Sequence, residues 1–299
     1  MSASVGFVGL GIMGKGMVKN LVTKLSYNLV VYNRSVEVSQ EVAALYPGKI
    51  EIASTAKEVI ERCNITYSML STLEASIAVF DSPEGVVAGV TAGKTIIDCA
   101  TLTPERMVEV EGRVRERGGR FLEAPVSGSK VPAEQGQLIF LCGGDETLFT
   151  EVQPALDAMG KAAFLFGPVG QGSRMKLVVN SIMGGMMTVF AEGMTLCEAA
   201  DLPTDKLLSV LDLGAMACPM YKGKGPLMIA KKYDPNFPLK HQQKDMKFAL
   251  GLADSLSLSL PVTAAANELY EASMKRERER GDLDFSAVVE TCREQKKEK

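Results

Sequence analysis

Residues 4–14 read SVGFVGLGIMG, and this stretch decides how the amino-terminal half of the chain folds. An apolar run typical of a buried strand leads directly into the spacing Gly9-x-Gly11-x-x-Gly14, and a helical pattern follows over residues 15–21. A strand, a glycine-rich turn and a helix in this order favour a dinucleotide-binding fold over an ordinary strand-to-helix turn, although the glycine spacing alone is weak evidence. In such a fold Gly9 permits the tight turn, Gly11 lets a pyrophosphate come close, and Gly14 allows the helix to pack closely on the sheet.

Short apolar runs rich in Val and Ile continue as far as residue 166, separated by amphipathic stretches long enough for helical crossovers. This alternation predicts an α/β domain over residues 1–170, with a Rossmann-type doubly wound parallel sheet and helices on both of its faces. The expected strands are residues 4–8, 29–32, 65–70, 95–98, 120–122, 138–142 and 162–166.

After Gly167 the pattern changes, and no further strand is expected. Residues 173–200 are apolar on nearly every face, which is typical of a buried helix. A second domain over residues 171–299 is therefore predicted to be all-helical. Its further expected helices are residues 203–213, 239–255, 262–279 and 286–296, with loops at Pro219, Gly223, Gly225, Pro226, Pro235 and Pro238.

Composition limits the functions that are open to the chain. A length of 299 residues favours two domains, and 33 basic against 36 acidic residues give no positive field for nucleic acid. The longest uncharged apolar stretch, residues 177–191, is too short to cross a bilayer, so no membrane association is expected. No signal or transit peptide is recognised and residues 297–299 are not a peroxisomal address, so a cytosolic location is expected. Because the cysteines are scattered and His241 is the single histidine, no metal site is expected, and most thiols are predicted to be packing residues.

The end of the second expected strand indicates which nicotinamide cofactor such a fold would bind. An NAD-specific protein usually carries an acid here for the ribose hydroxyls, but residues 32–35 read YNRS. Arg34 can form charge-assisted hydrogen bonds with a 2′-phosphate, and Asn33 and Ser35 can donate to its oxygens. The sequence therefore predicts NADPH rather than NADH, the alternative being that Arg34 is an ordinary surface residue at a helix start.

Several routes to carbonyl reduction lack their residues in this chain. The ligands of a zinc site are missing, a single histidine leaves little room for a histidine acid, and no Tyr-x-x-x-Lys occurs. Lys176 and Asn180, in contrast, lie four residues apart on one face of an otherwise apolar helix. A lysine in a partly dry cleft can have a lowered pKa and protonate an alkoxide as hydride arrives. Lys176 is therefore the candidate acid, and the alternative is a lysine that only extends its ammonium to solvent.

Four motifs carry a resemblance to a known family. They are residues 6–14, residues 123–129 (EAPVSGS), the helix of Lys176, and residues 237–245 (FPLKHQQKD). Together they are highly specific. The chain resembles the β-hydroxyacid dehydrogenase family from residue 6 to about residue 289, and within it most resembles the plant-type glyoxylate/succinic semialdehyde reductases.

The resemblance implies that Lys176 is the general acid, that Ser127 and Gly128 bind the substrate carboxylate, and that Thr101 touches the nicotinamide half of the cofactor. The residues expected at the cofactor are, in full, Gly6, Phe7, Val8, Gly9, Leu10, Gly11, Ile12, Met13, Gly14, Asn20, Asn33, Arg34, Ser35, Met69, Leu70, Thr101 and Lys244. Those expected at the substrate are Ser127, Gly128, Ser129, Asn180, Phe237 and Asp245.

The turn after Pro125 also suits a carboxylate on physical grounds, because its backbone N–H groups and the Ser127 hydroxyl can bind an anion. The alternative is a turn with a purely structural role. Two positions depart from common family patterns. Ala100 lacks a hydroxyl that relatives often have, so that contact cannot be carried over. Ser129 stands where hydroxyisobutyrate enzymes usually have a second glycine, which favours the glyoxylate/semialdehyde branch.

The predicted activity is hydride transfer from NADPH to the aldehyde carbon of glyoxylate or succinic semialdehyde, giving glycolate or 4-hydroxybutyrate. NAD-dependent oxidation of 3-hydroxyisobutyrate or a related β-hydroxy acid is the alternative, which Arg34 and Ser129 oppose. A non-catalytic interaction module of the same fold is a second alternative, which the presence of Lys176 opposes. The expected partner is a small aldehyde acid, and the resemblance suggests a homo-oligomer, either a dimer or a tetramer, assembled through the helical half.

Overall fold

The computed structural model describes residues 5–295, without the side chain of Arg278. Three sequence-based expectations fall at least partly outside this described part of the chain. They are the start of the first strand at residue 4, the end of the last helix at residue 296, and the reading of residues 297–299 as lacking a peroxisomal address.

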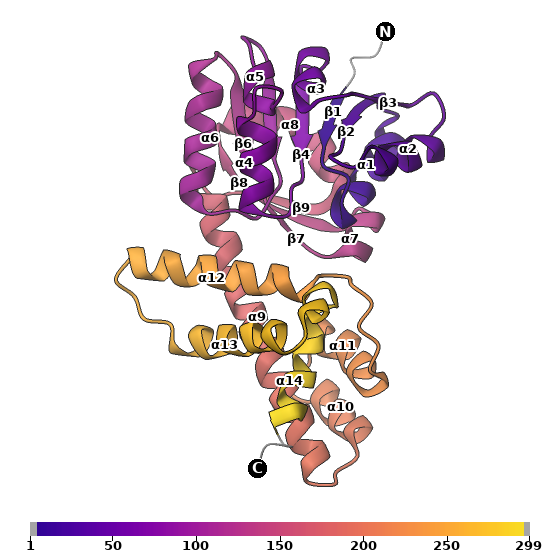
Figure 1. Cartoon of the computed structure of the whole chain (residues 1–299), viewed down its shortest axis with the longest axis vertical. Coiled ribbons are helices and arrows are strands. Elements are labelled where there is room, and N and C mark those ends of the chain that lie inside the picture. The colour runs from indigo at the N-terminus through magenta and orange to yellow at the C-terminus, as the bar shows by residue number, and fades with distance from the viewer. Residues whose placement is uncertain (1–4, 296–299) are drawn as a thin grey trace. The chain divides into compact units, whose positions relative to one another are not determined.

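Two compact units divide the chain, one ending at Lys176 and the other beginning at Leu177. Figure 1 labels most of the helices and strands of both units. The expected domain boundary, before residue 171, coincides with the first residue of helix α9 (Gln171–Ala199). The compact units divide farther along this helix, so its first turns belong to the first unit and the rest to the second.

One sheet runs through the first unit. Its strands are β1 (Val5–Val8), β2 (Leu29–Tyr32), β3 (Ile50–Ile52), β4 (Ile65–Ser68), β5 (Thr95–Asp98), β6 (Arg120–Glu123), β7 (Val126–Ser127), β8 (Leu138–Gly144) and β9 (Gly160–Leu165). The strand order is β3-β2-β1-β4-β5-β6-β8-β7, with β9 paired to β8. The strands β1 to β6 run parallel in the 3-2-1-4-5-6 order of dinucleotide-binding sheets. Such sheets bind their ligand at the carboxyl ends of the strands, where the order reverses between β1 and β4.

The sheet departs from the expected purely parallel arrangement at one edge. Strand β8 is antiparallel to both β6 and β7, while β9 is parallel to β8. The sequence pattern does not predict β3 or β7, because β3 has no buried residue and β7 has only two residues. Segments this short or this exposed carry no period that separates a strand from a loop.

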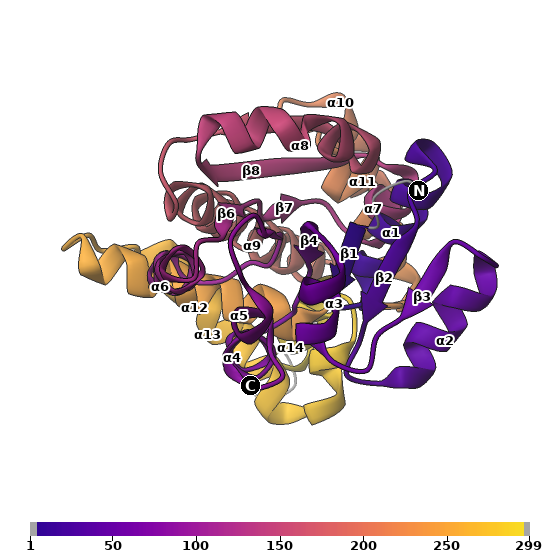
Figure 2. The same ribbon diagram turned by 90° about the horizontal axis from the view of Figure 1, so that it is seen from above.

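Two apolar cores, one on each face of the sheet, make the unit doubly wound, as predicted. The first core takes side chains from α1 (Ile12–Leu25), α2 (Val36–Leu45) and α8 (Glu146–Met159). The second takes side chains from α3 (Ala56–Arg62), α4 (Leu73–Asp81), α5 (Val86–Gly89) and α6 (Pro104–Glu116). Figure 2 shows α8 and α5 on opposite sides of the strands. The short helix α7 (Lys130–Gln135) packs on α1.

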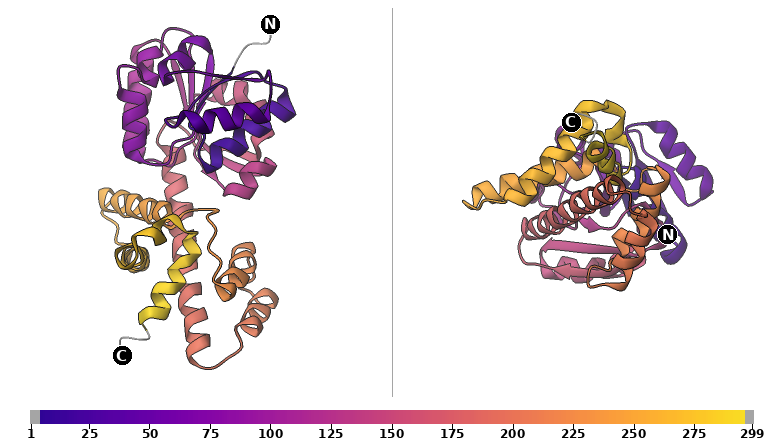
Figure 3. Two further views of the ribbon diagram at one scale, coloured as in Figure 1. Left: turned by 45° about the vertical axis from the view of Figure 1, so that its right-hand side comes forward. Right: turned by 90° about the horizontal axis from the view of Figure 1, so that it is seen from below.

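The second unit is helical, as predicted, and its core forms around α9 (Figure 3). Met187, Phe190 and Met194 of α9 lie in this core with side chains from the other helices. Those helices are α10 (Thr204–Leu213), α11 (Pro219–Ala230), α12 (Leu239–Ser255), α13 (Pro261–Arg276) and α14 (Val288–Gln295), with short 3₁₀ turns at Arg278–Asp282 and Phe285–Ala287. By length and composition alone α9 could cross a membrane, a test that the core helix of a soluble protein also meets.

Helix α11 corrects the expected loop at Pro219, Gly223, Gly225 and Pro226. Pro219 occupies the first turn, where its missing N–H costs no hydrogen bond. A side chain on Gly225 would come within 2.5 Å of Leu208 in α10, so this glycine permits helix packing instead of ending a helix. Gly225, a residue type that usually interrupts helices, thus serves a tertiary contact here.

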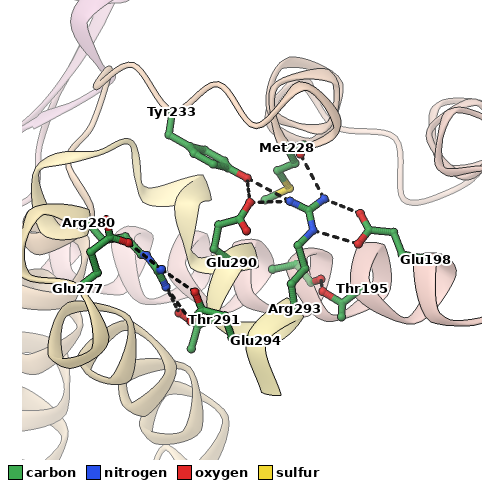
Figure 4. Close-up of polar contacts among 11 residues, drawn as sticks. Thr195, Glu198, Met228, Tyr233, Glu277, Arg280, Glu290, Thr291, Arg293 and Glu294 are labelled. Carbon is green, nitrogen blue, oxygen red and sulfur yellow. Dashed lines mark hydrogen bonds and ion pairs between the residues drawn. The ribbon is translucent and has the colours of Figure 1, made fainter. Parts of the chain in front are cut away.

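Two arginines, Arg280 buried and Arg293 half-buried, hold α14 in the second unit (Figure 4). The Arg293 guanidinium bonds both carboxylate oxygens of Glu198 in α9, and its Nη1 lies 2.7 Å from Glu290 Oε1. Arg280 bonds Glu294 at 2.7 Å and Glu277 at 2.9 Å. Because each guanidinium meets two carboxylates, its burial leaves no uncompensated charge.

All six cysteines are free thiols, and five of them are buried. Burial raises the pKa of Cys63 and Cys292 to about 11 and that of Cys142 to about 12. The remaining cysteine, Cys218, is partly exposed at the start of α11. Most thiols therefore act as small apolar packing residues.

Candidate active site

The glycine-rich turn of the first unit has the geometry that nucleotide binding requires. Gly9 has a φ of +96°, and a Cβ on it would lie 2.4 Å from the Met69 carbonyl oxygen. A Cβ on Gly14 would lie 2.1 Å from the Gly9 carbonyl oxygen, so no larger residue fits there without a shift. A Cβ on Gly11, in contrast, would meet nothing within 4 Å. Gly9 thus makes the turn, Gly14 closes the packing, and Gly11 leaves open space in which a pyrophosphate fits.

The helix that follows this turn begins without a protein cap. The N-cap of α1 is Gly11, which supplies no side-chain hydrogen bond, and the first turn contains no acidic residue. The first backbone N–H groups of a helix have no partner within it, and the helix dipole favours an anion beside them. The start of α1 is therefore suited to a phosphate group.

Both ends of the Asn33 side-chain amide form hydrogen bonds with the backbone. Its Oδ1 accepts the Leu10 N–H at 3.0 Å, and its Nδ2 donates to the Ser35 carbonyl oxygen at 3.0 Å. The side chain therefore braces the glycine-rich turn against the end of β2. Arg34 beside it is exposed and forms no ion pair with the described residues, which leaves its guanidinium available to a 2′-phosphate.

Five of the expected cofactor residues are buried. Gly6, Phe7, Val8 and Leu10 are buried in the strand and turn. Asn20 is 1% exposed, and its Nδ2 donates at 2.8 Å to the carbonyl oxygens of Gly16 and Ala133. Asn20 therefore joins α1 to α7, and these five positions support the turn from within. Ile12 is exposed and Met13 half-buried, so both keep a surface for the cofactor.

The carboxyl ends of β4 and β5 lie beside the glycine-rich turn or lead toward it. The Met69 N–H donates to the Val8 carbonyl oxygen at 2.9 Å, and Leu70 is buried against the turn. Thr101, two residues after the buried Cys99, is half-buried. Of these expected cofactor residues, Met69 and Thr101 retain accessible surface.

Asp98, at the end of β5, is a residue that the sequence motifs do not single out. It is fully buried, and its Oδ1 accepts the Ser68 hydroxyl at 2.9 Å and the Ala100 N–H at 3.1 Å. Burial raises the pKa of Asp98 to about 6. Its carboxyl group orders the turn that leads to Thr101. An acid at the end of a strand whose preceding residues are mostly apolar is the signal that could have indicated this role.

The expected carboxylate site, residues 127–129, begins at the end of β7. Ser127 and Ser129 are half-buried, and Gly128 between them is exposed with a φ of +144°. Neither serine hydroxyl is hydrogen-bonded to another side chain or to the backbone within residues 5–295 as the structure describes them. Two hydroxyls and an exposed glycine in succession suit a small anion.

Lys176 and Asn180 lie one turn apart on α9. Lys176 is 5% exposed and Asn180 is 1% exposed, although the residues around them on this helix are largely apolar. A buried ammonium is costly unless polar groups surround it, so its retention on an apolar helix points to chemistry.

Asp245 of α12 organises the expected substrate residues of the second unit. Its Oδ2 accepts Asn180 Nδ2 at 2.6 Å, and its Oδ1 lies 3.1 Å from Lys244 Nζ in an ion pair without hydrogen-bond geometry. Gln242 Nε2 also donates to the Asn180 carbonyl oxygen at 2.9 Å. Asp245, 1% exposed, therefore orients Asn180 and Lys244, whereas the resemblance predicts that it lies at the substrate itself.

The aromatic and imidazole groups near Asp245 have distinct environments. Phe237 is half-buried and packs edge-on against Phe285, with ring centroids 5.7 Å apart. Burial, followed by the charge of Lys244, lowers the pKa of His241 to about 4. The single histidine is therefore neutral at pH 7 and is a poor proton donor there.

Comparison with known proteins agrees with both units. Residues 4–167 match the family model of the NAD binding domain of 6-phosphogluconate dehydrogenase. Residues 170–292 match the model described as NAD-binding of NADP-dependent 3-hydroxyisobutyrate dehydrogenase.

Two curated relatives and one solved structure extend this likeness. Glyoxylate/succinic semialdehyde reductase 1 of Arabidopsis thaliana is 47% identical, over 97% of this chain and 98% of the relative. The chloroplastic glyoxylate/succinic semialdehyde reductase 2 of the same plant is 44% identical, over 98% of this chain and 80% of the relative. A crystal structure of 3-hydroxyisobutyrate dehydrogenase from Salmonella typhimurium matches with a TM-score of 0.87 at 23% identity, over 97% of this chain and 99% of that one. At this identity the structural match speaks for the fold alone.

Proposed function

Because this chain belongs to the β-hydroxyacid dehydrogenase family, we propose that it uses NADPH to reduce the aldehyde group of glyoxylate or succinic semialdehyde. The products are glycolate and 4-hydroxybutyrate. The observation that carries the proposal is the buried Lys176 on an apolar helix, followed one turn later by Asn180. The two plant reductases that match nearly the whole chain support this choice of substrate class.

The accessible residues of the first unit suit the cofactor. NADPH, when bound, supplies a hydride to the carbonyl carbon. Gly11 and the uncapped start of α1 provide space and N–H groups for its pyrophosphate. The exposed Arg34 supplies a charge for its 2′-phosphate.

The chain itself supplies the proton and holds the substrate. Ser127 and Gly128 bind the carboxylate of the aldehyde acid through a hydroxyl and backbone groups. Lys176 donates a proton to the carbonyl oxygen as that oxygen gains negative charge, and solvent then returns a proton to the amine. One hydride and one proton together convert the aldehyde to the alcohol. Asp245 keeps the Asn180 amide oriented as a substrate ligand.

A substrate panel tests this proposal. NADPH oxidation is followed with glyoxylate, succinic semialdehyde and other 2-oxo acids, and NAD⁺ reduction is followed with 3-hydroxyisobutyrate and related β-hydroxy acids. We expect the highest kcat/KM for glyoxylate or succinic semialdehyde with NADPH. A preference for 3-hydroxyisobutyrate with NAD⁺ would show that the chain is a β-hydroxyacid dehydrogenase and not an aldehyde reductase. No turnover with any of these compounds would contradict the proposal that the chain is an enzyme of this kind.

We further propose that the chain forms a homo-oligomer through its helical unit. Val178, Ile182, Val189 and Leu196 lie on one face of α9 and are 49–70% exposed. A continuous apolar face of this kind usually marks an interaction surface. Light scattering should give a dimer or tetramer, and Ile182→Glu should shift it toward the monomer. A wild-type monomer at all concentrations would contradict this proposal.

A further inference from the structure

A buried acid holds the first turn of the helix that carries Lys176. Glu123, the last residue of β6, is 0% exposed. Its Oε1 accepts the N–H groups of Gly170 at 2.6 Å and Gly172 at 2.7 Å. Its Oε2 accepts the Ser173 hydroxyl at 2.7 Å and the Ser173 N–H at 3.3 Å. One carboxyl group thus receives four donors from the segment in which α9 begins.

The surrounding backbone leaves room for this arrangement and for no additional side chain. A Cβ on Gly143 of β8 would lie 2.3 Å from Glu123 Oε1. A Cβ on Gly172 would lie 2.2 Å from the Leu141 carbonyl oxygen. The sheet and the start of α9 therefore meet backbone to backbone, with the Glu123 carboxyl group between them.

The four bonds account for donors that the helix itself cannot satisfy. The first N–H groups of an α-helix have no intrahelical acceptor. In α9 the Gln171 N–H donates to the Pro168 carbonyl oxygen at 3.2 Å, and those of Gly172 and Ser173 donate to Glu123. Because Ser173 lies three residues before Lys176, fixing Ser173 fixes the turn from which the lysine projects.

The carboxyl group can hold these donors whether or not it is ionised. Burial raises the pKa of Glu123 to about 7, against the lowering effect of its four hydrogen bonds. In the acid form a proton on Oε2 can be donated to the Ser173 hydroxyl, while Oε1 still accepts from Gly170 and Gly172. A capping serine or aspartate within the helix would satisfy one or two N–H groups without joining the helix to the sheet.

We propose that Glu123 is a positioning residue, whose bonds from the end of β6 to the first turn of α9 hold the Lys176 ammonium where it delivers its proton. The role in catalysis rests on the function proposed above. Glu123 touches neither substrate nor cofactor in this account, and it acts only through the helix.

Replacement of Glu123 by leucine removes the acceptors at similar volume, and Glu123→Gln restores the main acceptor. Rapid mixing of the enzyme–NADPH complex with glyoxylate measures hydride transfer, and 4-deuterated NADPH identifies that step by its isotope effect. We expect Glu123→Leu to slow hydride transfer at least tenfold with the isotope effect fully expressed, while the Kd for NADPH stays within twofold. Glu123→Gln should recover the rate to within about threefold.

A readout that needs neither substrate nor cofactor tests the anchor directly. Amide hydrogen exchange over residues 170–176 should become faster in Glu123→Leu and return toward the wild-type rate in Glu123→Gln. Asp81→Leu is the matched control, because it removes a carboxylate that pairs with the buried Arg106 far from α9 in the sequence. It should lower Tm without changing hydride transfer per folded molecule.

The outcomes separate the anchor from the proposed function. If the unmodified chain reduces the aldehydes and Glu123→Leu transfers hydride within twofold of it, the positioning role is wrong although the function stands. If the unmodified chain reduces none of the aldehydes, the proposed reductase function is wrong. The positioning role of Glu123 in that reaction is then wrong too, even if amide hydrogen exchange shows that Glu123 holds residues 170–176. Should Glu123→Leu not fold, Ser173→Ala decides: slower hydride transfer with faster exchange supports the role, and no change in either overturns it.

Discussion

Two helices that start within the first unit begin in opposite ways. Helix α1 starts at a glycine with no side-chain cap and no acid in its first turn, and the space beside Gly11 is open. Helix α9 starts against a buried carboxyl group that receives four donors. At both starts the first N–H groups have no acceptor within the helix, and both present the positive end of a helix dipole. The difference shows that a helix N-terminus can bind a ligand when its N–H groups have no partner in the chain. It stabilises the structure instead when a side chain of the same chain accepts those N–H groups.

This contrast assigns separate tasks to the two helices. Substitutions at the start of α1 should change cofactor affinity, while substitutions on α9 should change the rate of the chemical step. The following predictions test that separation.

The largest expected effect is at Lys176. Lys176→Ala should lower kcat by roughly 10²–10⁴-fold, the usual contribution of a general acid, while the Kd for NADPH stays near the wild-type value. Steady-state kinetics and fluorescence titration with NADPH measure the two quantities. Lys176→Met, which keeps most of the side-chain volume, controls for the loss of packing. Near-normal turnover in either variant would show that α9 does not supply the acid.

A smaller effect is expected at Arg34, on the cofactor side of the contrast. Because a hydrogen bond to a charged group is worth about 1.5–3 kcal/mol, Arg34→Ala should weaken NADPH binding by roughly ten- to a hundredfold. NADH lacks the 2′-phosphate, so its affinity should change little. Calorimetric titration of both cofactors provides the comparison. Equal losses for NADPH and NADH would contradict a phosphate-binding role for this exposed arginine.

Gly11 and Gly14 form a matched pair within the same turn. Gly14→Ala should destabilise the fold by about 1–3 kcal/mol, because its Cβ would overlap the Gly9 carbonyl group. Gly11→Ala should leave Tm unchanged, since its Cβ meets nothing, but should weaken NADPH binding by occupying the open space. Thermal denaturation and NADPH titration distinguish the two. If Gly11→Ala binds NADPH normally, the open space is not the pyrophosphate site.

The smallest expected effect is on the pH dependence of the free energy of unfolding, through the Glu123 carboxyl group at the start of α9. Since burial raises the pKa of folded Glu123 to about 7, above its ordinary value near 4.5, folded protein retains this proton over a range in which unfolded protein has lost it. Its stabilising contribution is therefore complete below about pH 4.5 and is lost as pH rises through 7. Denaturant unfolding at pH 5.5 and 6.5 should show a decline about 1 kcal/mol larger in wild type than in Glu123→Gln. Parallel declines in the two proteins would show that Glu123 does not titrate in this range.

The sequence predicts those parts of the fold in which local pattern and tertiary structure agree. The glycine spacing after β1 and the apolar helix of Lys176 predict the two units, and the bounds of α12 agree with the expected 239–255. Helix α11 is missed because Pro219 and Gly225 are ordinary loop signals, and only the folded chain shows that Gly225 lies too close to Leu208 for a side chain. The antiparallel edge of the sheet is missed because an apolar run does not record strand direction.

In the candidate site, too, the sequence predicts some residue roles and not others. Arg34 and Lys176 can be selected because their chemistry is unusual for their positions. Asn20 and Asn33 cannot be separated from ligand-binding amides by sequence, since only the folded chain shows their backbone partners. The tasks of Glu123 and Asp98 depend on donors distant in sequence, and the sequence shows no more than an acid at the end of a buried strand.

The burial of the thiols has a consequence for a protein that handles free aldehydes. Aldehydes are electrophiles that combine with thiolates to give hemithioacetals, and a thiol with a raised pKa supplies very little thiolate near neutrality. With five of six sulfurs inside the fold, the chain presents little reactive thiol to the compounds that we propose as its substrates. Thiol adducts formed during prolonged exposure to glyoxylate should accordingly concentrate at Cys218.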